Sequence, residues 1–103
     1  MDYKFTYLAE EDLDDILSYL CNELCNKTAA ANFYSKAMEA IDRMCEFPES
    51  YPLVENEFVD RKIRKAIIDN YVLYYYCDID EKLITILRIV YGKRDLEMLL
   101  RNI

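Results

Sequence analysis

The side chains best suited to chemistry lie in the second half of the chain, where cations alternate with tyrosines and aliphatic residues. Residues 58–103 carry nine basic and seven acidic side chains, whereas residues 1–57 carry four basic and thirteen acidic ones. The cations concerned are Arg61, Lys62, Arg64, Lys65, Arg88, Lys93 and Arg94. A basic region on an acidic scaffold suits a localised anionic partner. On charge alone, however, solvated cations that discourage aggregation at sheet edges explain the pattern better.

Two places in this region are more specific than the overall charge. Arg88 is the only charged residue in the stretch 83–90. A charge in a central strand is costly unless it is paired or faces a wet site, so Arg88 either pairs with a carboxylate or serves a functional site. Gly92-Lys93-Arg94-Asp95 places two cations at a strand-to-helix turn, where backbone N–H groups favour an anion. This turn is the best local candidate for a binding site.

Ten tyrosines are present, and several of them lie in one strand-like run. Alternation along a strand places Tyr71 and Tyr75 on one face and Tyr74 and Tyr76 on the other. Tyrosines on a sheet can stack on bases beside a phosphate-binding arginine. More often, such residues are core side chains whose hydroxyl reaches the surface.

The common catalytic and metal-binding constellations are absent. The chain has no histidine, which removes Ser-His and Cys-His pairs, and its single glycine rules out a glycine-rich phosphate loop of the usual kind. Cys21 and Cys25 are neighbours on a helix, but zinc takes four ligands and no histidine is available. We therefore expect no metal and no cofactor, and we interpret Cys21, Cys25, Cys45 and Cys77 as free cysteines that behave as small buried hydrophobes.

Three consecutive strands are predicted to carry the basic and aromatic side chains. The runs 61–68, 71–77 and 83–91 are rich in residues that fit a pleated, half-buried surface, and short Asn- and Asp-containing segments separate them. Connections this short allow antiparallel hairpins but no parallel crossovers. The sequence therefore predicts a three-stranded meander.

The first half is predicted to cover or extend this meander. Residues 3–8 alternate like a strand, and residues 9–26 then change to a helical period whose apolar stripe is Leu13, Ile16, Leu17, Leu20 and Leu24. A second helix begins after Thr28 as N-cap and ends near Glu46, before Pro48. Its apolar face is Ala30, Phe33, Ala37, Ala40, Ile41 and Met44. Residues 49–60 are expected to form a loop, and a short last helix is expected to follow Gly92, with Asp95 as its cap.

The length and composition favour one domain, residues 1–103, of the α+β class. The predicted order is a strand, a helical hairpin, a three-stranded antiparallel meander and a short C-terminal helix. No apolar run approaches the roughly 20 residues of a membrane helix, and the N-terminus lacks the pattern of a secretory signal. We expect a cytoplasmic protein that makes no use of the membrane.

The order of elements and several motifs resemble the RelE/ParE superfamily of bacterial toxins, also described as plasmid-stabilisation proteins. The resemblance covers essentially the whole chain. Its motifs, in chain order, are Ala9, Asp12-Leu13 and Ile16, then Phe47-Pro48, Ile63-Arg64-Lys65, Asn70-Tyr71, Tyr75, and the run from Ile86 to Leu96. Single pieces are loose, but their order and spacing are fairly specific.

The resemblance implies a growth-arresting toxin of a type II toxin–antitoxin module, encoded beside an antitoxin that wraps it. The basic sheet and last helix are the expected docking surface, with Leu96, Leu99 and Leu100 as apolar contacts. Because the toxin body is acidic, the antitoxin should differ from one that meets a basic toxin.

The superfamily divides by activity. ParE-like members block DNA gyrase, whereas RelE-like members cut mRNA on the ribosome by activating the 2′-hydroxyl. This sequence departs from the cleaving pattern, because Tyr91 stands where many relatives have histidine and Val72 stands where cleaving members have arginine. An unperturbed tyrosine, with a pKa of about 10, is poorly matched to proton transfer near neutral pH unless neighbouring cations lower that value.

Three functions stay open. The favoured one is a ParE-like toxin that binds an essential target such as gyrase. The second is a metal-independent mRNA endonuclease, whose catalytic residues are expected to be Arg64, Lys65, Arg88, Tyr91 and Arg94; the net charge of −7 counts against it. The third is a degenerate relative that binds antitoxin without harming the cell.

Overall fold

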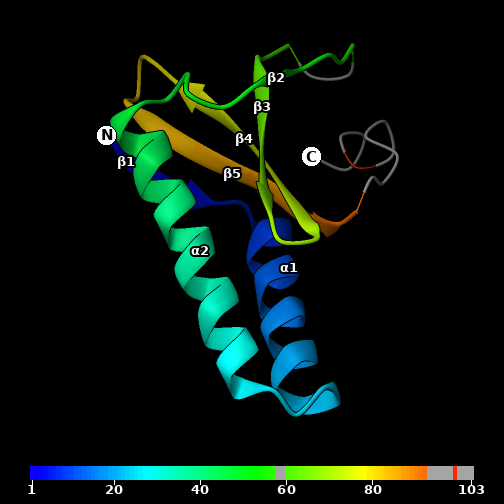
Figure 1. The fold of residues 1–103 in the computed structure, drawn as a ribbon. Coiled ribbons are helices and arrows are strands. Elements are labelled where there is room, and N and C mark those ends of the chain that lie inside the picture. The colour runs from blue at the N-terminus through cyan, green and yellow to red at the C-terminus, as the bar shows by residue number, and fades with distance from the viewer. Residues whose placement is uncertain (58–59, 93–98, 100–103) are drawn as a thin grey trace.

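The computed structural model describes residues 1–57, 60–92 and 99. Two long helices, joined as a hairpin, cover one face of a five-stranded sheet (Figure 1). The elements in chain order are β1 (Asp2–Phe5), α1 (Tyr7–Ser18), a π-helical turn (Tyr19–Glu23), α2 (Lys27–Glu46), β2 (Leu53–Val54), β3 (Ile63–Ile68), β4 (Tyr71–Asp78) and β5 (Leu83–Tyr91). This order confirms the α+β class and the strand, hairpin and meander sequence; the expected last helix lies outside the described residues, apart from Leu99.

The predicted meander forms the centre of the sheet. The strand order is β1-β5-β4-β3-β2, and β4 pairs in antiparallel fashion with both β3 and β5. The two hairpin turns pass through Asp69 and Lys82, both at positive φ. The boundaries of the three predicted strands lie within two residues of the observed ones. The largest difference is at the start of β3, which begins at Ile63 and not at residue 61.

Two strands extend the meander on either side, and only one of them was predicted. β1 pairs with β5 in parallel, and the short β2 pairs with β3 inside the stretch that we predicted to be a loop. β2 has only two residues, so its alternation is too short to recognise in sequence. The expected loop over 49–60 is therefore wrong at Leu53 and Val54.

The helix boundaries differ from the predicted ones because of their caps. The Thr6 side chain accepts a hydrogen bond from the Ala9 N–H (3.1 Å), so α1 begins at Tyr7 and the first strand ends at Phe5. Asn26, and not Thr28, caps α2, because its side chain accepts from the Ala29 N–H (3.0 Å). The single helix expected over 9–26 is instead α1 followed by the π-helical turn, and Leu24 at the end of the predicted stripe is exposed.

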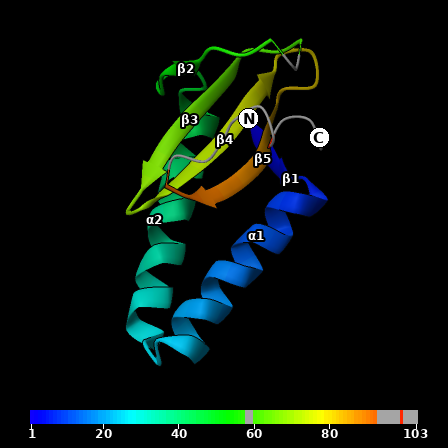
Figure 2. The same ribbon diagram turned by 90° about the vertical axis from the view of Figure 1, so that its right-hand side faces the viewer.

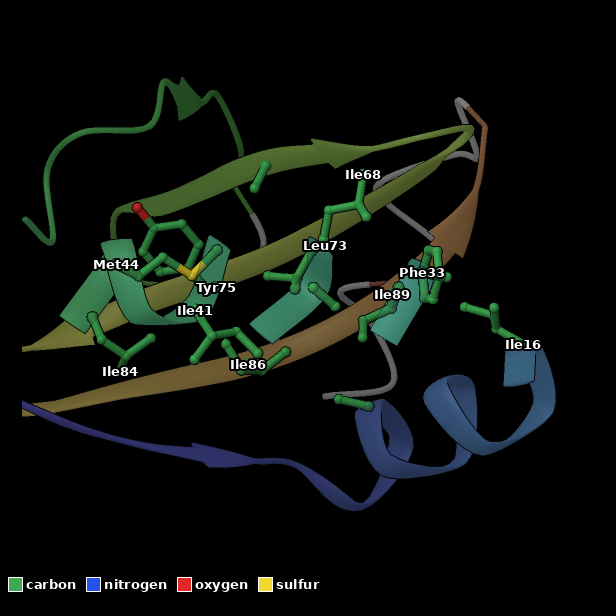
Figure 3. Close-up of a cluster of buried hydrophobic side chains, with 13 residues drawn as sticks. Ile16, Phe33, Ile41, Met44, Ile68, Leu73, Tyr75, Ile84, Ile86 and Ile89 are labelled. Atoms are coloured by element: carbon green, nitrogen blue, oxygen red, sulfur yellow. The ribbon is translucent and has the colours of Figure 1, made fainter. Parts of the chain in front are cut away.

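The main core lies between the sheet and the helical hairpin (Figure 3). The apolar face predicted for α2 is confirmed, with five of its six residues buried and Ala40 packed at the margin. From the sheet, Leu73, Tyr75 and Ile86 point into the same space. Figure 2 shows the tip of the hairpin projecting beyond the end of the sheet. No helix in the described part is long and apolar enough to cross a membrane.

The cysteines are free, as expected, but none of the four is fully buried. Cys25 is exposed in the turn between the helices, where it has a positive φ of 48°. Cys21, Cys45 and Cys77 are half-buried. The prediction that they serve as buried hydrophobes was wrong in this respect, because Cys45 and Cys77 pack only at the margin of the core and Cys25 is exposed.

Candidate functional site

The sheet face opposite the helices, which we call the open face, carries a second apolar cluster. Its buried members are Ile63, Val72, Tyr74, Leu87, Val90 and Leu99, and Val54 and Tyr76 pack against them. Of the three leucines predicted to contact a partner, Leu99 is therefore buried in this cluster, while Leu96 and Leu100 lie outside the described residues. The predicted faces of the four strand tyrosines are those observed, since Tyr71 and Tyr75 pack with the helical core.

Cations and tyrosines meet on the open face along the rows of the sheet. Lys65 in β3 is directly opposite Tyr74 in β4, and Tyr74 is directly opposite Arg88 in β5. The Arg61 guanidinium lies 4.4 Å from the centre of the Tyr76 ring, a cation–π contact. It also forms an ion pair of 3.7 Å with Asp78. These rows make the open face both aromatic and basic.

Arg88 is held by a carboxylate from α1. Its Nε and Nη2 donate to the two oxygens of Asp12 at 2.7 and 3.0 Å, a bidentate arrangement with strong geometric preference. The Ile89 N–H donates to the same Asp12 Oδ2 at 3.0 Å. The hydrogen bond to Asp12 raises the pKa of Arg88 above its ordinary value. Both side chains are more than four-fifths buried, so pairing accounts for the isolated charge in this strand.

Arg64 projects to the helical side of the sheet, and its guanidinium holds the loop after α2. Its Nη1 donates to the carbonyl oxygens of Tyr51 (2.7 Å) and Glu49 (3.3 Å). Beside it, the buried Tyr75 hydroxyl donates to the Pro48 carbonyl (2.9 Å). Burial raises the pKa of Tyr75 to about 12, against the opposing effect of the nearby Arg64 charge. Arg64 thus fixes a loop and leaves its tyrosine neighbour protonated.

Tyr91 lies at the other end of the sheet, with 58% of its surface exposed. Its ring packs edge-to-face on Tyr71 (5.4 Å between centroids), and Tyr71 packs in the same way on Phe33 (5.1 Å). The pKa of Tyr71 is raised, mainly by burial. Gly92 follows with a φ of +63°, and its N–H donates to the Asn70 carbonyl at 2.8 Å. The positive φ explains why glycine is favoured at this turn.

The five predicted catalytic residues are not gathered into one cluster within the described part. Lys65 and Arg88 share a row, but the Arg88 guanidinium is bound to Asp12. Arg64 faces the helices in the row of Tyr75, and Tyr91 lies in the row of Tyr71, four residues away along β4. Arg94 lies outside the described residues. The sequence analysis names Asp12 only as part of a family motif and does not identify its carboxylate, which accepts three hydrogen bonds, as the partner of Arg88.

A hollow of about 550 Å³ lies beside Arg64 and the end of α2. Its walls combine apolar side chains, such as Phe47 and Ile79, with two acidic and two basic ones. This mixture of charges favours no ligand class. No group of three metal-binding side chains occurs within residues 1–57, 60–92 and 99.

Comparison with known proteins identifies the family. The profile of the family described as ParE toxin of type II toxin–antitoxin system, parDE, matches residues 3–96. No curated protein matches the chain.

Three solved structures show that the fold is shared. The chromosomal ParDE toxin–antitoxin system of P. aeruginosa contains a chain with 20% identity and a TM-score of 0.68, covering 90% of this chain and 97% of that one. In the archaeal RelE–RelB complex of Pyrococcus horikoshii OT3, identity is 17% and the TM-score 0.61, with 91% and 97% covered. In the RelBE2 toxin–antitoxin complex of Mycobacterium tuberculosis, identity is 18% and the TM-score 0.55, with 87% and 95% covered. With the fold in common and the profile matched almost end to end, this chain belongs to the ParE toxin family of type II toxin–antitoxin systems.

Proposed function

We propose that this ParE-type toxin arrests growth by binding an essential protein target such as DNA gyrase, and that a cognate antitoxin neutralises it. One observation carries the choice of a binding mechanism: two of the three arginines expected to serve cleavage are already engaged within the fold. Arg88 is bound bidentately by Asp12, and Arg64 donates to two loop carbonyls. A group that must stabilise developing charge on a phosphate has to be free to face it.

The tyrosines support the same choice. A tyrosine that acts as a general base near neutral pH needs a pKa far below its usual value of about 10. Every shifted tyrosine in the described part moves the other way, because burial or a neighbouring carboxylate raises its pKa. Exposed Tyr91 lies away from Arg64, with Tyr71 as its ring partner.

The mRNA endonuclease is the alternative, and one feature favours it. Lys65 on the open face and exposed Tyr91 form no ion pair in the described part of the chain, and Arg94 follows Tyr91 closely in the sequence. Tyr91 nevertheless shares the helical side of the sheet with Tyr71, so the chain would have to bring its hydroxyl and Lys65 to one substrate from opposite faces. In that mechanism Lys65 and Arg94 would stabilise the phosphate, and Tyr91 would move the proton. A degenerate relative that has lost toxicity is the third outcome.

The test is induction of the chain in a bacterial host without its antitoxin, with growth followed while new mRNA 5′ ends are mapped. A binding toxin stops growth without cuts inside translated codons, and Tyr91→Phe stays as toxic as the original. Tyr7→Phe, at an exposed tyrosine on α1, is the matched control.

Cuts inside codons that disappear in Tyr91→Phe and persist in Tyr7→Phe would establish the endonuclease instead. Normal growth at a confirmed protein level would favour the degenerate relative. Co-expression of the antitoxin encoded beside the gene must restore growth in either toxic case.

A further inference from the structure

A groove runs where both helices meet the end strand of the sheet. We call it the edge groove; its volume is about 400 Å³. Residues of β1, α1 and α2 line it: Tyr3, Phe5, Glu10, Leu13, Asp14, Tyr34 and Met38. Phe5, Leu13 and Met38 form its floor, because they are half-buried and pack against the main core. The Tyr3 and Tyr34 rings are 39% and 46% exposed. An apolar floor with exposed aromatic side chains is typical of surfaces that bind a partner.

The edge groove lies beside an unpaired strand edge. β1 is the end strand of the sheet and pairs only with β5 among the described residues (Figure 1). The Thr6 N–H donates to the Ile86 carbonyl at 3.0 Å. Because backbone groups alternate along a strand, those of Lys4 also face β5, whereas those of Tyr3 and Phe5 face outward. These outward groups can receive another chain by β-addition.

The charge of the edge groove indicates the charge of the chain that would bind there. Glu10 and Asp14 lie one turn apart on α1, both are exposed, and neither forms an ion pair in the described part of the protein. Among residues 1–57, 60–92 and 99, no lysine or arginine lines the groove.

We propose that the edge groove binds a cationic and apolar segment of the cognate antitoxin. Apolar side chains of that segment fill the space above Leu13 and Met38, and its lysines or arginines face Glu10 and Asp14. This inference rests on the proposed function, and it assigns the chemistry of the antitoxin segment. A second copy of this chain is a poorer occupant, because each copy carries a net charge of −7 and the same acidic groove. Nucleic acid is repelled for the same reason.

The experiment measures the affinity of the full chain for the antitoxin encoded beside its gene. Charge reversal by Glu10→Lys with Asp14→Lys should weaken binding about 30-fold at about 0.05 M salt, and the loss should shrink at about 0.5 M salt. Asp15→Lys with Glu39→Lys is the matched control, because it changes the net charge equally at exposed residues outside the edge groove. The control should stay within about threefold of the original.

Two further measurements keep the proposal falsifiable if the reversal variant folds poorly. Glu10→Gln with Asp14→Asn preserves side-chain size and should give an intermediate loss of affinity. Amide exchange at Tyr3 and Phe5 should slow in the complex, because their outward N–H groups become paired.

Equal losses in the two reversal variants, or no slowing at Tyr3 and Phe5, would overturn the groove assignment while leaving toxin neutralisation intact. An antitoxin that neutralises through an acidic segment would also overturn it. Failure of the chain both to arrest growth and to bind that antitoxin would overturn the proposed function itself.

Discussion

The contact between Asp12 and Arg88 gives a prediction that bears on both stability and function. Asp12 accepts three hydrogen bonds of 2.7 to 3.0 Å, two from the guanidinium and one from the Ile89 N–H. The pairing of β1 with β5 ends at Phe5 and Ile86, so the later residues of β5 have no β1 partner. The Asp12 carboxylate accepts the hydrogen bond of one of them, the Ile89 N–H. The residue therefore supports a strand edge and a charged side chain together.

The magnitude follows from what each substitution leaves behind. Asp12→Ala leaves a mostly buried guanidinium and a backbone N–H without their partner, which should lower the free energy of unfolding by about 3–5 kcal/mol. Arg88→Met should cost somewhat less, about 2–3 kcal/mol, because the Asp12 carboxylate loses its cation but keeps its bond to Ile89, and methionine fills part of the space. The double variant should recover about 2 kcal/mol of the summed losses, since no unpaired cation remains.

Equilibrium urea unfolding of the four proteins measures this cycle, with equal m-values as the check that the unfolded states are comparable. Arg88→Met at permissive temperature should remain toxic, because we assign Arg88 a structural role. If Asp12→Ala changed the unfolding free energy by less than about 0.5 kcal/mol, Arg88 would not be committed to the fold, and the reasoning would be refuted.

Three other predictions follow from single features. Thr85→Val should raise the unfolding free energy by about 1 kcal/mol in thermal denaturation, because the buried Thr85 hydroxyl has no hydrogen-bond partner among the described residues; a lower melting temperature would contradict this. The pKa of Tyr75 is about 12 in the folded protein and about 10 in the unfolded chain, so the unfolded chain loses this proton first as the pH rises. The free energy of unfolding should therefore fall by about 1 kcal/mol per pH unit between pH about 10 and about 12. Tyr75→Phe should remove that part of the pH dependence in unfolding titrations, and an unchanged profile would count against it. Gly92→Ala should cost about 1 kcal/mol in urea unfolding through its φ of +63° alone, because a Cβ there meets no described residue within 4 Å, and Gly92→Asn should cost less.

The central strands could be predicted because their signals are local. The runs of β-branched and aromatic residues in β3, β4 and β5 fit a half-buried sheet, and Asp69-Asn70 marks the turn between two of them. The parallel pairing of β1 with β5 depends on contacts about 80 residues apart, which no short pattern encodes. The register shift at Tyr74/Tyr75, opposite Leu87, is equally invisible in the alternation of β4.

The site was only partly predictable for a related reason. Arg88 is unusual in its strand, so the need for a partner could be recognised from the sequence. The choice of Asp12 could not, because Glu10, Glu11, Asp14 and Asp15 offer the same chemistry nearby. The first turn of α1, set by the Thr6 cap, decides which carboxylate reaches β5. That Arg64 turns to the helices and Lys65 to the open face follows from alternation once the strand register is known.

The most direct test of the account is titration of the purified chain into a DNA gyrase supercoiling assay, with the antitoxin encoded beside its gene added afterwards. A toxin that acts by binding should inhibit supercoiling in proportion to its concentration, Arg88→Met should inhibit equally at a temperature where it is folded, and the antitoxin should restore activity. Unaffected gyrase, together with codon-specific cutting of mRNA on purified ribosomes that is lost in Lys65→Ala and Tyr91→Phe, would contradict the binding mechanism and establish the endonuclease.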